Sequence, residues 1–220
     1  MMASQDWTDP GSTGKVKSLN SVQDQPEGGT MQAKDIALIA LFAALTCALG
    51  FTPLIPLPFV GITFALQTLG MLLAGGIIGA KRGALAMLLV MVLVAIGLPV
   101  LTGGQGGLAK FVGPTAGFIW SWPIGALLVG ALIEHWWVKL TFLKALVATV
   151  LGSLSLYVLG QTWLAISMSI PFRTAVWSWV AYLPGDIVKS VVAAGVIVTV
   201  KRAYPLITPS QPRQRQQAGV

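Results

Sequence analysis

The chain has 220 residues, of which 55% are hydrophobic and 10% are charged, and its formal net charge is +7 at pH 7. Because a soluble domain carries about 25% charged residues, this composition excludes an ordinary soluble fold and indicates a protein whose apolar side chains face a lipid bilayer. A single cysteine, Cys47, and a single histidine, His135, exclude an intrachain disulfide, a zinc cluster and Cys/His catalysis within the chain. We therefore expect no catalytic residues, no metal and no cofactor.

Two polar tails flank the apolar part of the chain. Residues 1–31 are rich in glycine and serine, and residues 204–220 have the same polar character. Segments of low hydrophobicity cannot bury enough apolar surface to fold, so we expect a disordered extension at each end. The first tail also lacks the basic start and apolar stretch of a secretory signal. Residues 32–203 are predicted to form one transmembrane substrate-binding domain.

The apolar part divides into segments that can cross a bilayer, which takes about 20 mostly apolar residues per helix. Lys81 and Arg82 predict a tight turn between the second and third segments, and an irregular stretch precedes the last one. We predict an all-α membrane protein, a bundle of six transmembrane helices at about Ile36–Phe51, Ile62–Ala80, Gly83–Ile96, Phe118–Ile133, Phe142–Ile166 and Asp186–Val200.

Basic residues are distributed unevenly between the two sets of loops that six spans create. With the N-terminus inside, the outer loops carry Lys110 and Arg173. The inner side carries Lys34, Lys81, Arg82, Lys139, Lys144, Lys201 and Arg202. Because positive residues concentrate in short cytoplasmic loops, both termini are predicted to be cytoplasmic, and the net charge reflects membrane orientation rather than nucleic-acid binding. Tryptophans near both ends of the fourth span, Trp120, Trp122, Trp136 and Trp137, fit interfacial aromatic belts.

The first predicted helix carries a stripe of small residues. Ala40, Ala44 and Ala48 recur at every fourth position and therefore lie along one helical face. Small residues at this spacing allow helices to approach closely in lipid. The stripe predicts a face that docks on a partner.

Gln67 lies inside the apolar second segment, between Thr63 and Thr68. A buried amide needs hydrogen-bond partners. Those partners belong either to a neighbouring helix or to a ligand, and the residues alone leave both readings open.

A glycine-rich loop is expected between the third and fourth helices. It contains GGQGG at Gly103–Gly107, with Gly104 and Gln105, and then GPTAG at Gly113–Gly117, with Thr115. Glycine lets the backbone approach a ligand closely, and the polar side chains add hydrogen-bonding groups. Since no GxxxxGK[ST] pattern occurs, a nucleotide-phosphate loop is excluded, and we predict a flexible outer gate over a cavity.

Asp186 and Lys189 stand at the head of the last predicted helix, three residues apart and so on one face. Charges within the membrane are costly, so they pair, face a cavity, or both. One hypothesis is a ligand site, in which Asp186 accepts N–H groups and Lys189 donates to an oxygen. The other is a structural ion pair at a helix N-terminus, where an acidic residue is favourable.

Four segments, in order along the chain, resemble the BioY family of biotin-binding proteins. The resemblance covers about residues 32–203, and Leu101 and Ala116 depart from the aromatic and the glycine common in the family. The segments are ITFALQTLGMLLAGGIIGAKRGALAM, GLPVLTGGQGG, GPTAGF and YLPGDIVKS.

The resemblance implies the substrate-binding (S) component of an energy-coupling factor (ECF) transporter, which binds biotin from the outer side of the membrane. It implies that Asp186, Lys189 and Gln67 contact the ligand and that the GGQGG loop covers it. It also implies that the alanine stripe docks on a transmembrane coupling subunit, which two cytoplasmic ATPases drive.

The chemistry of biotin fits these residues. Its ureido ring has two N–H donors and a carbonyl, and the molecule also has apolar rings, an apolar chain and a carboxylate. Asp186 would accept a ureido N–H, whereas Lys189 would donate either to the ureido carbonyl or to the carboxylate. Trp163 and Phe111 are expected to pack on the rings, since such sites are mostly apolar.

Three alternatives stay open: an S component for another vitamin such as riboflavin or thiamine, a stand-alone oligomeric biotin transporter, and an intramembrane enzyme. The enzyme is opposed because no histidine lies inside a predicted span and no GxSxG or HExxH pattern occurs. The acidic residues in the spans are Asp186 and, at an edge, Glu134, too few for a proton relay. Partner ATPases are therefore the expected source of energy.

Overall fold

The structure, a computed structural model, describes residues 31–51, 55–57, 62–64, 66–180, 182–204 and 206. The chain divides into residues 1–32 and a helical unit, Ala33–Val220, and the helical unit is described below. The tails that were predicted to be disordered lie almost wholly outside the described residues. The described elements are α1 (Ala33–Gly50), β1 (Ile55–Leu57), β2 (Ile62–Phe64), α2 (Gln67–Ile78), α3 (Ala80–Ala95), η1 (Leu108–Phe111), α4 (Ala116–His135), η2 (Trp137–Lys139), α5 (Phe142–Ser167), α6 (Phe172–Val180) and α7 (Leu183–Ala203).

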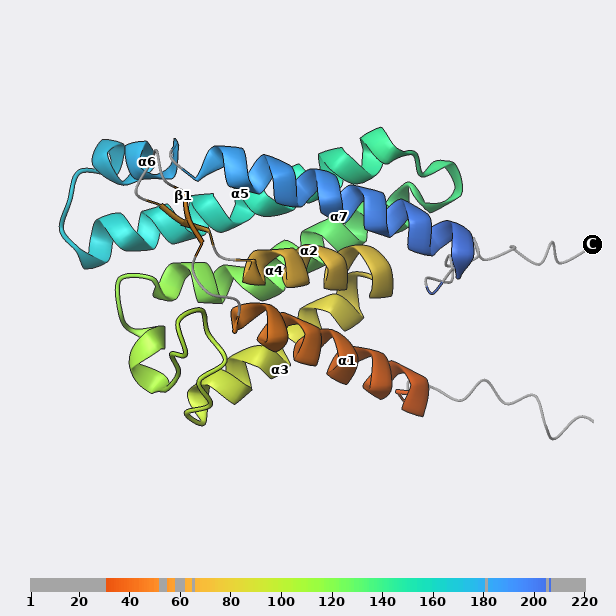
Figure 1. The fold of residues 1–220 in the computed structure, drawn as a ribbon, viewed down its shortest axis with the longest axis horizontal. Coiled ribbons are helices and arrows are strands. Elements are labelled where there is room, and N and C mark those ends of the chain that lie inside the picture. Colours follow the sequence, from red (N-terminus) through yellow and green to blue (C-terminus); the bar gives the residue numbers. More distant parts are fainter. Residues whose placement is uncertain are drawn as a thin grey trace, which may run out of the picture. The chain divides into compact units, whose positions relative to one another are not determined.

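Four of the described helices, α1, α4, α5 and α7, are long and apolar enough to cross a membrane. The prediction of a helical membrane protein is therefore confirmed. α4 packs against α5, α3 and α2, while α7 packs against α5 and α2 (Figure 1). α2 has 12 residues, or about 18 Å of helix, and nearly all of its side chains are buried by its neighbours.

The second predicted helix was placed too early, and the turn after it too late. Ile62–Phe64 form β2, which pairs antiparallel with β1, so the helix begins at Gln67 rather than at Ile62. The chain then breaks at Gly79, whose φ of 93° favours glycine. Lys81 and Arg82 lie in the first turn of α3 instead of forming the turn.

The break between α2 and α3 is covered by α4. The Ala80 N–H donates to Glu134 Oε1 at 2.8 Å, which gives one unpaired N–H at the start of α3 a charged acceptor. A Cβ on Gly130 would lie 2.3 Å from the Ala80 nitrogen. Glycine at this position of α4 therefore allows the close approach of the three helices.

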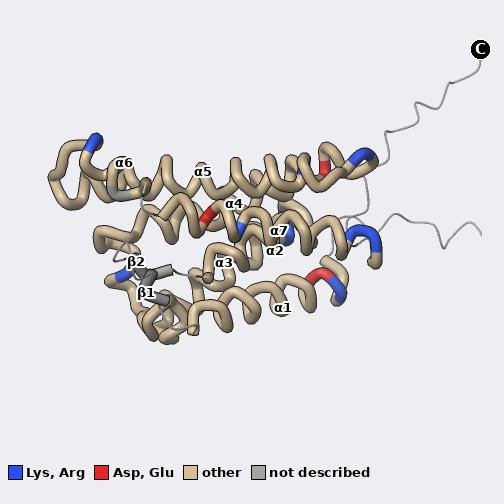
Figure 2. Tube along the Cα trace, turned by 45° about the horizontal axis from the view of Figure 1, so that its top comes forward, with Lys and Arg blue, Asp and Glu red and all other residues tan. Residues whose placement is uncertain are grey.

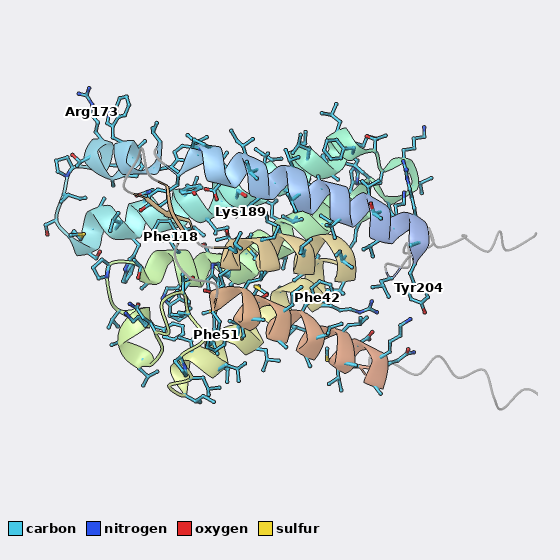
Figure 3. All side chains as sticks on the ribbon, in the orientation of Figure 1. Phe42, Phe51, Phe118, Arg173, Lys189 and Tyr204 are labelled. Carbon is cyan, nitrogen blue, oxygen red and sulfur yellow. The ribbon has the colours of Figure 1, made fainter. Side chains whose placement is uncertain are left out.

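Charged residues gather at one end of the bundle, where α1 begins and α7 ends (Figure 2). There Arg82 pairs with Asp35 at 2.8 Å and links α3 to α1, and Lys201 donates to the Trp137 carbonyl. Figure 3 shows Tyr204 at this end, Arg173 on α6 at the opposite end and Lys189 between them, inside the bundle. The paired strands β1 and β2, helix α6 and the connection between α3 and α4 lie at the end of the bundle opposite the charged cluster (Figure 1).

Candidate functional site

A cavity of about 430 Å³ lies among α2, α4, α5, α7 and the segment that joins α3 to α4, residues 96–115, called here the α3–α4 loop. Its volume is within the range of about 300–1,000 Å³ that is usual for small-molecule sites. Most of its wall is apolar or aromatic, with a few polar groups. The lining residues are Gln67, Thr68, Leu101, Thr102, Gln105, Lys110, Thr115, Phe118, Ile119, Trp122, Leu156, Tyr157, Gln161, Leu164, Tyr182, Asp186 and Lys189.

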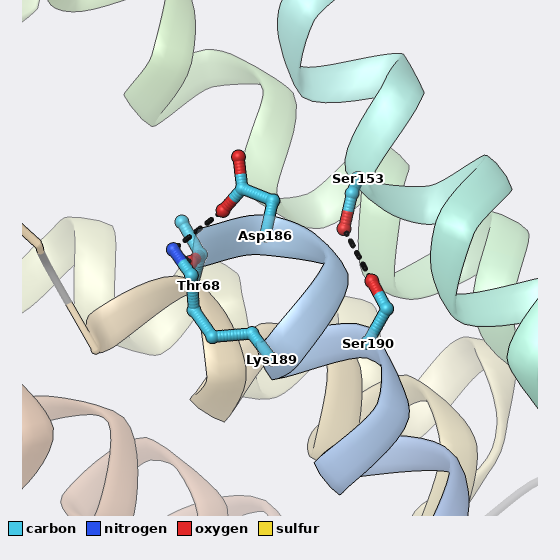
Figure 4. Close-up of polar contacts among 5 residues, drawn as sticks. All are labelled: Thr68, Ser153, Asp186, Lys189 and Ser190. Atoms are coloured by element: carbon cyan, nitrogen blue, oxygen red, sulfur yellow. Dashed lines mark hydrogen bonds and ion pairs between the residues drawn. The ribbon is translucent and has the colours of Figure 1, made fainter. Parts of the chain in front are cut away.

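The Asp186–Lys189 ion pair lines this cavity from the first turns of α7. Lys189 Nζ lies 2.6 Å from Asp186 Oδ1, and the two side chains are 9% and 13% exposed respectively. Lys189 Nζ also donates to Thr68 Oγ1 of α2 at 2.9 Å, as Figure 4 shows. The lysine thus connects α7 to α2. The two residues form an ion pair and also line the cavity, so the geometry is compatible with both hypotheses drawn from the sequence.

Two acceptor atoms beside the cavity make no hydrogen bond to the described residues. They are Asp186 Oδ2, which points away from Lys189 in Figure 4, and Gln161 Oε1 on α5. Both atoms are buried, and a buried acceptor without a partner costs about 1–3 kcal/mol. Because both side chains line the cavity, a ligand with N–H donors would remove this cost.

α5 contacts α7 close to the charged pair. Thr149 Oγ1 shares its hydrogen between the Leu146 carbonyl at 2.9 Å and the Ser190 carbonyl at 3.1 Å. The Ser153 and Ser190 hydroxyls lie 3.5 Å apart (Figure 4). These contacts come one residue after Lys189. They join α5 to α7 next to the charged pair.

The side of the cavity nearest the α3–α4 loop is more exposed than the charged pair. Gln105 and Thr115 are exposed and Lys110 is half-buried. Lys110 Nζ donates to Gln105 Oε1 at 2.6 Å. The amide of Gln105 carries no negative charge that would offset the lysine, so this side of the cavity favours an anion.

The structure brings together five of the seven residues predicted to bind substrate: Asp186, Lys189, Gln67, Gln105 and Thr115 line the one cavity. Gly104 lies in the same loop with φ 68°, in the turn between Leu101 and Gln105, which form a β-bridge.

The two aromatic residues predicted to pack on the ligand rings are placed elsewhere. Trp163 borders a separate groove between α4 and α5, and its Nε1 donates to the Gly113 carbonyl at 2.9 Å. Phe111 packs edge-to-face on Trp120, with ring centroids 5.4 Å apart. Trp163 therefore ties the α3–α4 loop to α5.

The alanine stripe faces away from the bundle. Ala40, Ala44 and Ala48 are all exposed on α1, whereas Phe42, Ala43 and Cys47 of the same helix are buried. The face is therefore available to lipid or to a partner helix, and the predicted docking role stays a prediction.

Sequence reasoning missed several cavity residues. Trp122, read as part of an interfacial belt, is 6% exposed and lines the cavity with Phe118, one helical turn earlier on α4. Gln161 lines it from α5 together with Tyr157. A polar amide inside an apolar span is the signal that identified Gln67, and it could also have found Gln161.

Comparison with known proteins agrees with the earlier resemblance. The model of the BioY family matches residues 20–206. The chain is 44% identical to the biotin transporter BioY of Rhizobium etli, over 80% of this chain and 98% of that protein. It is also 44% identical to the biotin transporter BioY of Rhodobacter capsulatus, over 78% of this chain and 95% of that protein.

A solved structure described as the S-component for biotin from an ECF-type ABC transporter has the same fold. Its TM-score is 0.70 at 29% identity, and the match covers 79% of this chain and 95% of that one. The predicted resemblance is thus confirmed at the level of both sequence and fold. The chain belongs to the BioY family.

Proposed function

We propose that this multi-pass membrane protein binds biotin in the cavity and acts as the S component of an ECF transporter for biotin. The observation that carries the proposal is the buried Asp186–Lys189 pair, which lines a mostly apolar cavity and leaves Asp186 Oδ2 without a partner among the described residues. The names of the two relatives and of the solved structure support the choice of ligand.

The ureido ring of biotin matches the deep part of the cavity. Its two N–H groups suit the two acceptors that make no bond to the described residues, Asp186 Oδ2 and Gln161 Oε1. Its carbonyl oxygen suits the ammonium of Lys189, which is 9% exposed at its side chain. The apolar rings fit against Trp122 and Tyr157, since such pockets combine apolar walls with a few placed polar groups.

Lys110 gives the ligand an orientation. Two cations among the described residues line the cavity, Lys110 and Lys189. The carboxylate of Asp186 lies 2.6 Å from Lys189, whereas Lys110 bonds to a neutral amide. A second carboxylate near Lys189 would also face the charge of Asp186. We therefore assign the biotin carboxylate to Lys110 and the ureido carbonyl to Lys189.

We further propose six membrane spans, with α2 and α3 as the second and third, and cytoplasmic termini. The charged cluster at the start of α1 and the end of α7 supports this orientation, because basic residues favour the cytoplasmic side. The cavity then opens outward, through the α3–α4 loop.

The energy for uptake would come from partners rather than from an enzymatic activity of this chain. In this proposal the exposed face with Ala40, Ala44 and Ala48 docks on a transmembrane coupling subunit, which two ATPases drive. Small side chains at this spacing allow such an approach in lipid. A stand-alone homo-oligomeric transporter would use the same cavity, and an S component for another vitamin would use the same fold.

Isothermal titration of the purified chain with biotin, riboflavin and thiamine tests the ligand. Saturable one-site binding of biotin alone is expected, and binding of another vitamin in its place would refute the proposal. The orientation is tested with Lys110→Met against biotin and its neutral carboxamide. We expect about 0.5–1 kcal/mol weaker binding of biotin, two- to fivefold in Kd, because the contact is partly exposed. The carboxamide should bind both proteins equally, and an equal loss for both ligands would contradict the assignment.

A further inference from the structure

Gln67 holds the backbone of the α3–α4 loop with both ends of its amide. Its Nε2 donates to the Val100 carbonyl at 2.9 Å. Its Oε1 accepts from the Thr102 N–H at 3.2 Å and from the Thr102 hydroxyl at 3.1 Å. The two peptide groups that it binds flank Leu101, so the side-chain amide pairs with the loop much as a neighbouring β-strand would.

This arrangement leaves Gln67 little capacity for a ligand. An amide oxygen has two lone pairs, and both directions are taken by Thr102. One Nε2 hydrogen is taken by Val100. Gln67 is 3% exposed, so water is kept away from the three bonds. Hydrogen bonds are stronger in such an interior than in water.

The segment that Gln67 holds forms part of the cavity wall. Leu101, Thr102 and Gln105 all line the cavity, and Leu101 and Gln105 pair with each other, with the Leu101 N–H donating to the Gln105 carbonyl at 2.9 Å. Fixing the backbone at Val100 and Thr102 therefore fixes the turn that carries the wall residues. Release of Gln67 would free this turn to move away from the cavity.

The end of α1 lies against the same contact. A Cβ on Gly50, the last residue of α1, would lie 2.2 Å from the Val100 oxygen and 3.0 Å from Gln67 Nε2. Gly50 is buried and is not one of the described residues that line the cavity. The hydrogen bond between Gln67 and Val100 thus fits only where α1 ends in a residue without a side chain.

We propose that Gln67 is a positioning residue, whose hydrogen bonds to Val100 and Thr102, called here the clamp, hold the α3–α4 loop closed over the ligand. Gly50, at the end of α1, leaves the space that the bond between Gln67 and Val100 needs. The inference rests on the proposed function for the identity of the ligand. It changes the role given to Gln67 from a ligand contact to a loop contact. It also connects α1, whose opposite face carries the alanine stripe, to the wall of the cavity.

The clamp predicts an effect on the rate of ligand loss. A closed loop must open before a ligand leaves, so weakening the clamp accelerates dissociation. The ligand enters through the same opening, so weakening the clamp should leave association no slower than in the parent. A direct ligand contact at Gln67 would also be disturbed by Gly50→Ala, because the new Cβ would lie 3.0 Å from Gln67 Nε2, but it predicts no faster amide exchange in the loop without ligand.

The experiment compares Gly50→Ala with Gly195→Ala, a control in α7 whose added Cβ meets no described heavy atom within 4 Å. Stopped-flow exchange of bound biotin should show dissociation at least fivefold faster for Gly50→Ala, with association no slower than in the parent, and no change for Gly195→Ala. Thr102→Val removes the hydroxyl donor and should act in the same direction, and Thr102→Ser should restore the parent rate. The Thr102 pair tests the clamp where Gly50→Ala does not fold.

Hydrogen–deuterium exchange at the Leu101 and Thr102 amides, without ligand, separates the clamp from the identity of the ligand. Faster exchange in Gly50→Ala and Thr102→Val, but not in Gly195→Ala or Thr102→Ser, is expected. If the parent chain binds no biotin but exchange follows this pattern, the proposed function fails and the clamp stands. Unchanged exchange in both variants, or faster exchange with unchanged biotin dissociation, would overturn the proposal.

Discussion

Replacing Asp186 with asparagine separates a ligand-binding role from a purely structural one. The substitution keeps the shape of the side chain and one acceptor oxygen, but it removes the negative charge that lies 2.6 Å from Lys189 Nζ. In the proposed complex it turns a charge-assisted bond to a ureido N–H into a neutral one. Lys189 keeps its bond to Thr68.

The size of the effect follows from the burial of the pair. Hydrogen bonds to charged groups contribute about 1.5–3 kcal/mol and neutral ones about 0.5–1.5 kcal/mol. The side chain of Asp186 is 13% exposed, so water cannot replace the lost interaction well. We expect biotin binding to weaken by about 1–3 kcal/mol, which is roughly 5- to 150-fold in Kd.

Isothermal titration of the purified variant measures Kd, and thermal unfolding of the same sample measures stability. The matched control is Asp35→Asn, which breaks the ion pair with Arg82 at the other end of the bundle and should leave Kd unchanged. If Asp186→Asn lowers stability but binds biotin as tightly as the parent, the pair is structural only. That result would remove Asp186 from the site and refute the reasoning.

Two further predictions concern α1 and α4. Ala44→Trp should leave biotin binding intact but abolish biotin uptake in cells that express the coupling subunits, while Leu154→Trp, at an exposed position of α5, should support uptake; normal uptake with Ala44→Trp would contradict the docking face. Gly130→Ala should destabilise the fold by about 2 kcal/mol, and lower Tm by roughly 4–8 °C, because the new methyl group meets the backbone of Ala80. An unchanged Tm in a thermal unfolding assay, equal to that of Gly195→Ala, would show that α4 can shift to accept the methyl group.

Hydropathy and charge predicted the features that depend on the bilayer. Long apolar runs identified α1, α4, α5 and α7, because each of these helices alone must satisfy its backbone in lipid. Two charges three residues apart identified the Asp186–Lys189 pair, because charges in an apolar span need a partner or a cavity. Both signals are local, so one sequence was enough.

Features that depend on neighbours in space were not predictable in this way. The apolar residues Ile62–Phe64 suit a strand as well as a helix, and pairing with β1 decides between them. Trp122 and Trp163 are both tryptophans in apolar helices, and the sequence does not show which way each one points. In the structure Trp122 lines the cavity, whereas Trp163 lines a groove between α4 and α5. Gln67 was identified as polar and buried, but its partners come from a loop 33 residues away in sequence.

The short, enclosed α2 has a consequence for how the protein responds to its lipid. A helix of about 18 Å is far shorter than a hydrocarbon layer of about 30 Å, yet α2 is surrounded by protein along nearly its whole length and has little contact with acyl chains. Hydrophobic mismatch therefore acts on the tilt of the outer helices rather than on α2. Gln67 and Thr68, at the first turn of α2, keep their depth in the bundle when membrane thickness changes.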